Sequence, residues 1–135
     1  MLQPIELIIP VEPTAKARAR VTSFNGHFIS YTPAKTVSAE NDIMKYLYPY
    51  KNLCYPAGVG IKLTIIFYRT KPKSIKKSEL LPFRKPDTDN MTKLVLDACN
   101  EFLFPDDSQI TTLHTSKRWS DNGHGSIFLR MEEDA

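Results

Sequence analysis

The sequence lacks several features that mark large classes of protein. It has only two cysteines, Cys54 and Cys99, which form no CxxC pair, so it predicts neither a zinc site nor a disulfide framework. We expect both to be small buried hydrophobic residues in a reducing cytoplasm. No apolar run approaches the length of a membrane-spanning helix, and residues 1–10 lack the basic start and apolar stretch of a secretory signal. We therefore expect a cytoplasmic protein with no membrane partner.

Glycine-based catalytic motifs are also missing from this chain, which has five glycines. There is no Walker A loop, no dinucleotide-binding fingerprint and no G-x-S-x-G elbow, so nucleotide hydrolysis, hydride transfer and serine esterase chemistry have no support. The three histidines are dispersed along the chain, and we interpret them as surface or hydrogen-bonded residues: His27, His114 and His124.

Charged residues are ordinary in number but unevenly placed. The net charge is +3, yet residues 69–85 carry seven basic side chains against the single acid Glu79. Clustered Lys and Arg side chains neutralise phosphates and release counterions, which favours a nucleic acid as the partner. The alternative is a solvated loop whose lysines serve solubility. The residues that we expect to contact DNA are Lys16, Arg18, Arg20, Lys71, Lys73, Lys76, Arg84 and Lys85.

An acidic stretch follows the basic run directly. Asp87 and Asp89 are two residues apart, so their carboxylates point the same way if the backbone there is extended. Clustered carboxylates repel each other, and a hard cation such as Mg²⁺, which takes oxygen ligands, offsets that repulsion. Helix capping by Asp89 or Thr88 is the alternative, and it explains one acid better than two.

Two further groups extend this candidate site. Lys93 lies four residues after Asp89 on the polar side of a predicted helix. There it can approach a phosphate as a point charge, or pair with Asp89 or Asp97. Asp106-Asp107 is typical of an ordinary turn, and it becomes a ligand candidate only if the following strand begins beside the upstream acids. Three carboxylates around Mg²⁺ predict metal-assisted phosphodiester hydrolysis.

The hydrophobic pattern predicts several strands and two main helices. Alternation with a period of two indicates strands, a 3.6-residue pattern from Met91 to Leu103 indicates a helix, and Asn25-Gly26 indicates a hairpin turn. In chain order we expect a strand at 5–9, a basic connection at 14–20, a strand at 27–31, a helix from 32 to about 48, a strand at 59–68, a short helix near 75–80, a helix from 88–90 to 102, and a final hairpin of strands 110–119 and 126–131. The tail 132–134 is expected to fray.

This order of elements favours an α/β or α+β fold, in which a small mixed sheet carries two main helices packed on it. The length of 135 residues suits one modest core, and no linker or repeat divides the chain. We therefore expect a single domain over residues 1–135.

The acidic stretch and its surroundings resemble a known signature. Asp87-x-Asp89-Asn90-x-x-Lys93, with Asp97-Ala98 and Asp106-Asp107-Ser108-Gln109-Ile110 after it, is similar to the motif of the RusA family of Holliday-junction resolvases. Two N-terminal stretches, 10–21 and 31–36, resemble the same family, so the resemblance covers nearly the whole chain. Family members are small endodeoxyribonucleases common in phages and prophages.

The resemblance implies a RusA-like homodimer with two active sites, dependence on Mg²⁺ (with Mn²⁺ as a substitute) and paired cuts across a four-way DNA junction in recombination and repair. By motif position, Asp87, Asp89 and Asp107 would be the metal-binding catalytic carboxylates, and Lys93 would be the catalytic lysine. Some members have arginine directly before the first aspartate. Here Pro86 stands there, so Arg84 or Lys85 would supply that phosphate contact. The implied location is the cytoplasm of a bacterial host.

Two other functions fit the same basic surface. One is a metal nuclease that acts on flaps or forks, and the other is a module that binds branched DNA without cutting it. The presence of Asp87, Asp89, Asp107 and Lys93 argues against the second, because a phosphate-binding surface forms more easily without three acids.

Overall fold

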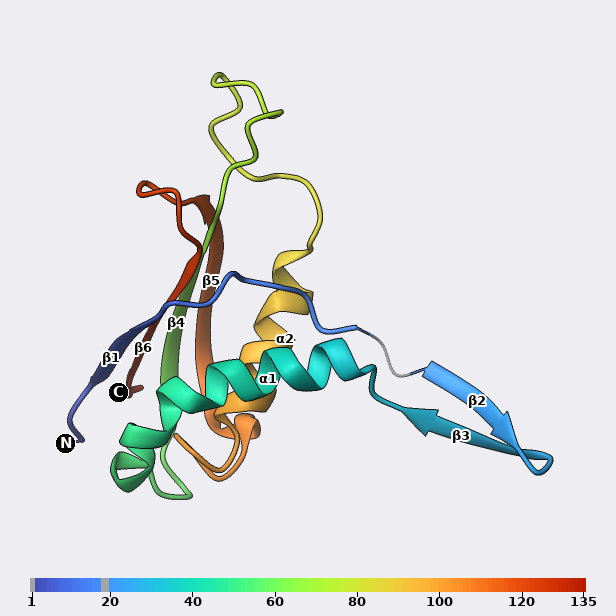
Figure 1. Ribbon diagram of the computed structural model, residues 1–135. Helices are drawn as coiled ribbons and strands as arrows, with labels where there is room; N and C mark the ends of the chain where they lie inside the picture. Colours follow the sequence, from blue (N-terminus) through green and yellow to red (C-terminus); the bar gives the residue numbers. More distant parts are fainter. Residues whose placement is uncertain (1, 18–19) are drawn as a thin grey trace.

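The computed structural model describes residues 2–17 and 20–135 (Figure 1). A four-stranded sheet has the order β1-β6-β4-β5, and β2 pairs with β3 in a separate hairpin. Two helices pack against the mixed sheet, which confirms the predicted α+β arrangement. The elements are β1 (Ile5–Ile9), β2 (Arg20–Phe24), β3 (His27–Tyr31), α1 (Ala34–Leu47), η1 (Tyr48–Leu53), β4 (Ile61–Arg69), α2 (Thr88–Cys99), η2 (Asp107–Gln109), β5 (Ile110–Trp119) and β6 (Ser126–Glu133). Within the described ranges, no helix is both long enough and apolar enough to cross a membrane.

The sheet joins segments that are far apart in the sequence. β4 lies in the interior of the sheet, pairing in parallel with β5 and antiparallel with β6, while β1 pairs antiparallel with β6. The predicted hairpin of residues 110–119 and 126–131 is wrong, because its two strands lie on opposite sides of β4. β4 is apolar on one face and half-buried on the other, as is typical of a strand in the interior of a sheet. The turn near 121–123 is therefore a crossover.

The core lies between one face of the sheet and the two helices. β4 directs Ile61, Leu63, Ile65 and Phe67 to that face, and each is at most 1% exposed. The apolar stripe predicted for α2 is buried as expected, at Met91, Leu94, Val95, Ala98 and Cys99. Cys54 is half-buried and Cys99 is buried, and burial raises the pKa of the Cys99 thiol to about 12. Neither cysteine forms a disulfide.

Several element boundaries differ from the predictions. α1 begins at Ala34, since Pro33 keeps an extended ψ of 141°. α2 ends at Cys99, because Asn100 leaves the helical region and Glu101 has a left-handed φ of 71°. The short helix expected near 75–80 is replaced by turns.

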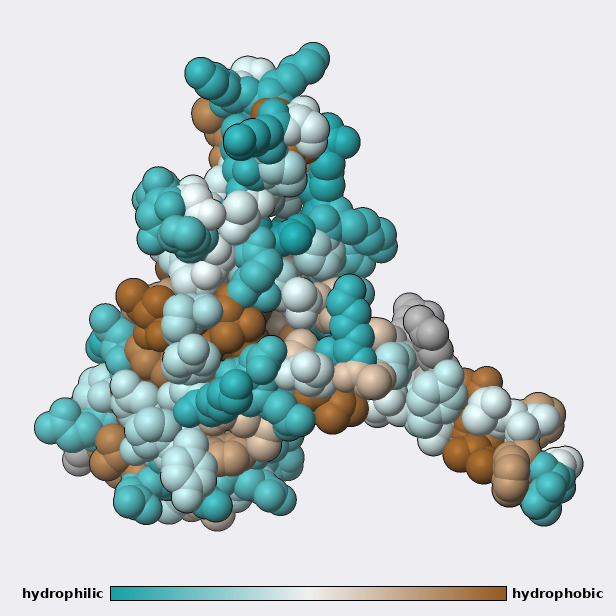
Figure 2. Space-filling model, in the orientation of Figure 1, coloured by the Kyte–Doolittle hydropathy of each residue, from teal (hydrophilic) through white to brown (hydrophobic). Residues whose placement is uncertain are grey.

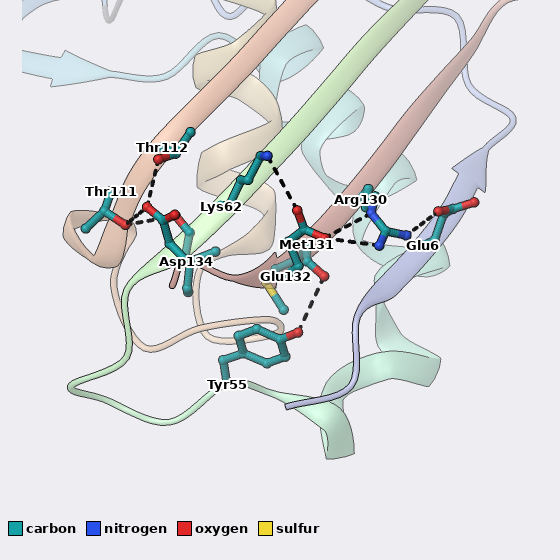
Figure 3. Close-up of polar contacts among 10 residues, drawn as sticks. Glu6, Tyr55, Lys62, Thr111, Thr112, Arg130, Met131, Glu132 and Asp134 are labelled. Carbon is teal, nitrogen blue, oxygen red and sulfur yellow. Dashed lines mark hydrogen bonds and ion pairs between the residues drawn. The ribbon is translucent and has the colours of Figure 1, made fainter. Parts of the chain in front are cut away.

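The C-terminal tail is ordered in β6 and does not fray as predicted. β6 extends to Glu133, and the Asp134 carboxylate accepts hydrogen bonds from the hydroxyls of Thr111 and Thr112, both at 2.7 Å (Figure 3). These two bonds hold the pKa of Asp134 below its usual value. Hydrogen bonds to β5 therefore anchor the end of the chain.

A charged network lies on the sheet face that points away from the helices (Figure 3). The guanidinium of Arg130 donates to Glu6 at 2.7 Å and to Glu132 at 3.0 Å, and Lys62 lies 3.7 Å from Glu132. These contacts link β1, β6 and β4 across the sheet. Arg130 and Lys62 on this face are therefore paired with acids of the same chain.

The β2–β3 hairpin projects away from the sheet (Figure 1). Asn25 and Gly26 have φ values of 51° and 77°, as the predicted turn requires. Large apolar side chains on the hairpin are open to solvent, including Phe24 (65% exposed) and Phe28 (84% exposed), and Figure 2 shows hydrophobic surface there. An isolated hairpin is at best marginally stable in water, and these apolar side chains are left open to solvent.

Candidate active site at the N-terminus of α2

Asp87 and Asp89 lie at the N-terminal end of α2. Asp87 is the N-cap residue, with an extended backbone, and Asp89 is in the first turn, so the two acids share a helix end rather than one face of a strand. The N-terminal end of a helix carries partial positive charge, which favours carboxylates there. The clustering of these two predicted site residues is therefore compatible with the local fold.

The carboxylate of Asp87 makes no capping hydrogen bond, although it occupies the capping position. Its ion-pair partner is Lys85, at 3.4 Å, and its side chain is 47% exposed. Asp89 is exposed and accepts the N–H of Asn90 at 3.0 Å. The capping alternative named Asp89 or Thr88, but the N-cap position falls on Asp87, whose uncapped oxygens are open to an external ligand.

Lys93 lies one turn after Asp89 and is held by Asp97. Its ammonium is 3.2 Å from Asp97 Oδ1, while its side chain is 57% exposed. An ion pair at this i, i+4 spacing orients the lysine without removing it from solvent. Asp97 is only 18% exposed, so it forms a fixed support for Lys93.

Lys16 reaches the same carboxylate from the segment after β1. Its ammonium binds Asp97 Oδ2 and lies 3.7 Å from Glu40 of α1, and its backbone N–H donates to the carbonyl of Asn90 at 3.1 Å. The hydrogen bond with Asp97 raises the pKa of Lys16 above its ordinary value, against the opposing effect of burial. Lys16 is therefore engaged inside the protein, and a DNA contact by this residue stays a prediction.

Asp107 lies at the opposite end of α2 and β5 from the other two acids. The 12 residues of α2 span about 18 Å. β5 rises about 3.3 Å per residue from Ile110, just after Asp107, to Lys117, whose ammonium is 2.9 Å from the carbonyl of Pro86 beside Asp87. Both routes put Asp107 roughly 20 Å from Asp87. The following strand does not begin beside the upstream acids, which was the condition for a shared site within one chain.

The role of Asp107 as a ligand stays a prediction. Across residues 2–17 and 20–135, no three His, Cys, Asp or Glu side chains gather as a metal site would require. Asp106 has a local task instead, since its carboxylate accepts the hydroxyl of Ser108 at 2.5 Å and it forms a capping box with Gln109 at the start of η2. Of the acidic pair, Asp107 is therefore the one without this capping role.

A basic loop, residues 70–86, leads into the site and is tied down at its base. The ammonium of Lys117 donates to the carbonyls of Arg84 and Pro86, both at 2.9 Å, and Arg69 donates to the carbonyl of Lys85 at 3.1 Å. These contacts fix the chain immediately before Asp87. Sequence reasoning missed the role of Lys117 in holding this loop, because the contact joins residues that are about thirty positions apart.

Glu79 is the centre of contacts inside the loop. Its carbonyl accepts the ammonium of Lys71 at 2.8 Å and the indole N–H of Trp119 at 3.1 Å. Its carboxylate accepts the guanidinium of Arg84 at 2.9 Å, and this bond lowers the pKa of Glu79 from its ordinary value. The single acid of the loop therefore organises it.

The basic residues expected to bind DNA fall into two groups. Lys71 and Arg84 are engaged by Glu79, whereas Lys73, Lys76 and Lys85 are exposed. Lys85 has a side chain that is 87% exposed and is the cation nearest Asp87. Arg18 lies outside the described residues, and the side chain of Arg20 is likewise not described.

An apolar groove of about 420 Å³ adjoins the acids between α2 and β5, lined by Thr88, Asp89, Thr92, Lys93, Leu96, Leu113 and Thr115. The buried hydroxyl of Thr92 lies 2.9 Å from the hydroxyl of Thr115 and donates to the carbonyl of Thr88 at 2.8 Å. These contacts fix the first turn of α2 against β5. Sequence reasoning missed this link because neither threonine carries a recognisable motif.

Asp87 and Asp89 fit a magnesium ion on chemical grounds. Mg²⁺ keeps several waters and is usually bound through one or two carboxylates together with substrate phosphates, so it needs no complete protein cage. The uncapped carboxylate of Asp87 beside the exposed Asp89 supplies that donor set. Lys85 and Lys93 flank it with positive charge suited to a phosphate.

Comparisons with known proteins place the same residues in context. The family model described as Endodeoxyribonuclease RusA matches residues 10–130, a range that contains Asp87, Asp89, Lys93 and Asp107. The chain is also similar to a protein of Bacillus subtilis (strain 168) described as Uncharacterized protein YqaN. The two are 29% identical over 136 residues, which covers 93% of this chain and 95% of that protein.

Proposed function

The chain belongs to the RusA endodeoxyribonuclease family, and from that premise we propose that it is a Mg²⁺-dependent enzyme that resolves four-way DNA junctions by paired cuts. The observation that carries the proposal is the uncapped carboxylate of Asp87 beside Asp89, with Lys93 one helical turn after Asp89. The basic loop of residues 70–86 comes directly before these acids in the chain. Residues 1–135 then act as one endonuclease domain, in the cytoplasm of a bacterial host that carries a phage or prophage genome.

The acids and the lysine of the candidate site have different roles in the proposed reaction. Asp87 and Asp89 would hold Mg²⁺, which supplies Lewis-acid stabilisation of phosphate charge when bound. Lys93, steadied by Asp97 at 3.2 Å, directs its ammonium to the charge that develops on the phosphate. Asp97 is a positioning residue in this scheme, because it acts through Lys93.

Lys85 is the better candidate for the phosphate contact that some family members assign to an arginine. Arg84 is paired with Glu79 at 2.9 Å and would have to break that pair to reach a substrate. Lys85 is 87% exposed and only 3.4 Å from Asp87, so it can bind a phosphate next to the acids without such a loss.

A homodimer is part of the proposal, and Asp107 is its main support. Within one chain Asp107 lies roughly 20 Å from Asp87, so a third carboxylate in the site would have to come from a second copy. A two-fold dimer would bring two such composite sites to the two strands that paired cleavage requires. The exposed apolar hairpin of β2 and β3 is a surface that a second copy can cover.

The test uses a synthetic four-way junction with each strand labelled in turn, incubated with purified protein with and without Mg²⁺. Symmetric paired nicks that need the metal are the expected result. Cuts on flaps or forks but not on junctions would replace the proposal with a flap or fork nuclease. Tight binding without cuts under Mg²⁺ or Mn²⁺ would identify a branched-DNA-binding module instead.

A further inference from the structure

The tip of the basic loop exposes a run of apolar side chains that the fold does not use. Leu80, Leu81 and Phe83 are 78%, 54% and 70% exposed, while Pro82 between them is buried. Large apolar side chains gathered on a surface are unusual and mark a contact with another molecule. We call residues 80–83 the apolar tip.

The apolar tip is held in a defined shape by hydrogen bonds around it. The N–H of Phe83 donates to the carbonyl of Leu81 at 3.0 Å, which makes a tight turn. Before the tip, Glu79 accepts hydrogen bonds from Lys71, Trp119 and Arg84. After the tip, the ammonium of Lys117 donates to the carbonyls of residues 84 and 86. The tip is therefore presented by a braced loop, so little ordering entropy remains to be lost on contact.

The apolar tip lies next to the proposed catalytic acids. Phe83 is four residues before Asp87, and a hollow of about 240 Å³ is lined by Leu81, Pro82, Phe83, Thr88, Lys117 and Arg118. Thr88 lies between the two acids in the sequence, so the hollow joins the aromatic ring to the start of α2. A molecule in the hollow would touch both Phe83 and Thr88, which is next to Asp87 in the chain.

The charges around the tip favour DNA over a second copy of the chain. Residues 69–85 carry seven cations against one acid, and the guanidinium of Arg84 lies 5.3 Å from the centre of the Phe83 ring. A two-fold contact through this loop would bring like charges together, whereas a nucleic acid would neutralise them. An exposed aromatic ring among cations is the combination on which unpaired bases stack.

We infer that the apolar tip, with Phe83 as its principal side chain, stacks against bases exposed at the branch point of the DNA substrate. This inference rests on the proposed function. A continuous duplex keeps its bases stacked on one another, whereas opening a branch point interrupts the stacking and exposes base faces. The tip therefore selects branched DNA over linear duplex, while Lys73, Lys76 and Lys85 contact phosphates in either form.

The experiment compares Phe83→Ala and Phe83→Trp with the full-length wild type. Affinities are measured for a four-way junction and for a linear duplex of the same sequence, in Ca²⁺ to prevent cleavage, with 2-aminopurine at the branch point as a reporter of stacking. The matched control is Tyr48→Ala, an aromatic residue that is 67% exposed near the C-terminal end of α2, where its ring meets Phe102. Because Phe83 is exposed, its replacement should leave folding intact, and circular dichroism checks this.

We expect Phe83→Ala to lower the preference for junction over duplex by about tenfold and to abolish the 2-aminopurine change, while Phe83→Trp and Tyr48→Ala behave as the wild type. An equal loss on both DNAs, or no loss, would overturn the inference. Loss of self-association in Phe83→Ala, seen by sedimentation, would assign the tip to a protein contact and also overturn it. Leu80→Ala, a second exposed position, should show a smaller loss in the same direction.

Wild-type cleavage, measured in parallel with Mg²⁺, separates this inference from the proposed function. If the wild type cuts junctions and Phe83→Ala keeps the full junction preference, only the role of the apolar tip is wrong. If the wild type does not cut but Phe83→Ala loses junction preference, the tip is correct and the catalytic proposal fails.

Discussion

Lys16 and Asp97 form an ion pair that joins two parts of the chain separated by 81 residues in the sequence. The same carboxylate holds Lys93 at 3.2 Å, so one half-buried acid connects the segment after β1 to the candidate catalytic lysine. Lys16 and Asp97 are 29% and 18% exposed, which makes this pair less open to screening by solvent than a surface pair. The Lys16–Asp97 pair therefore connects the stability of the fold to the position of the Lys93 side chain.

Replacement of Lys16 by methionine should destabilise the protein by about 1–2 kcal/mol, because Asp97 loses a charged hydrogen-bond donor while remaining mostly buried. The free energy of unfolding in urea measures this change. Lys45→Met is the matched control, since Lys45 forms an exposed pair with Asp42 at 3.9 Å and should cost less than about 0.5 kcal/mol. Equal effects of the two substitutions would show that the Lys16 pair is not structurally important.

The same pair predicts a pH dependence in alkaline solution. The pKa of Lys16 is raised in the folded protein above the ordinary value of 10.5, mainly by the hydrogen bond with Asp97. A raised lysine pKa means that the stabilisation is complete below the unfolded pKa and is lost as the pH rises through the folded pKa. The difference in unfolding free energy between wild type and Lys16→Met should therefore be constant near neutral pH and shrink above pH 10.5. A difference that grows with pH would contradict this assignment.

Asp87→Asn and Asp89→Asn should each reduce junction cleavage by roughly a hundredfold or more, because a metal ligand contributes several kcal/mol to the stabilisation of phosphate charge. Junction binding should be kept or tightened, since one negative charge is removed from a DNA-facing surface. Single-turnover cleavage and gel-shift affinity separate the two effects. Asp121→Asn, an exposed acid in the crossover after β5, should change neither. Loss of binding in the two site variants would mean that the acids support the fold.

Mixing two inactive variants tests whether Asp107 acts in the site of a second copy. In a mixed dimer of Asp87→Asn and Asp107→Asn, a composite arrangement leaves one site with both native acids, so single-strand nicking should return. If each site belonged to one chain, both sites of the mixed dimer would carry a substitution and nicking would stay absent. Asp106→Asn alone should keep most of its activity, because Asp106 caps η2.

Glu79→Ala should loosen the basic loop and expose it to trypsin. The substitution removes the carboxylate that holds Arg84 at 2.9 Å, so cleavage after the loop lysines and Arg84 should accelerate several-fold. The Arg84 bond lowers the pKa of Glu79, so this tie is complete above the ordinary value of 4.5 and is lost as the pH falls through the folded pKa. Limited proteolysis followed by mass spectrometry locates the cuts. Cuts confined to the β2–β3 hairpin would show that Glu79 does not brace the loop.

The sequence alone determined the elements whose signal is local. Alternating apolar residues marked β4, the 3.6-residue stripe marked α2, and Asn25-Gly26 marked the hairpin turn, because backbone conformation and side-chain periodicity are properties of neighbouring residues. The same locality placed Asp87, Asp89 and Lys93 together, since they lie within two turns of one helix start.

Tertiary structure decided which distant segments meet, and a single sequence contains no local signal for that. The insertion of β4 between β5 and β6 overturned the expected final hairpin, because strand order depends on which edges pair in the folded sheet. The same topology separated Asp107 from the other acids and joined Lys16 to Asp97, while the folding of the basic loop turned Lys71 and Arg84 toward Glu79. Asp87 lies at the start of α2 and Asp107 just before β5, so the lengths of this helix and this strand set the distance between the two acids. The site of this protein is therefore defined by its topology as much as by its motif.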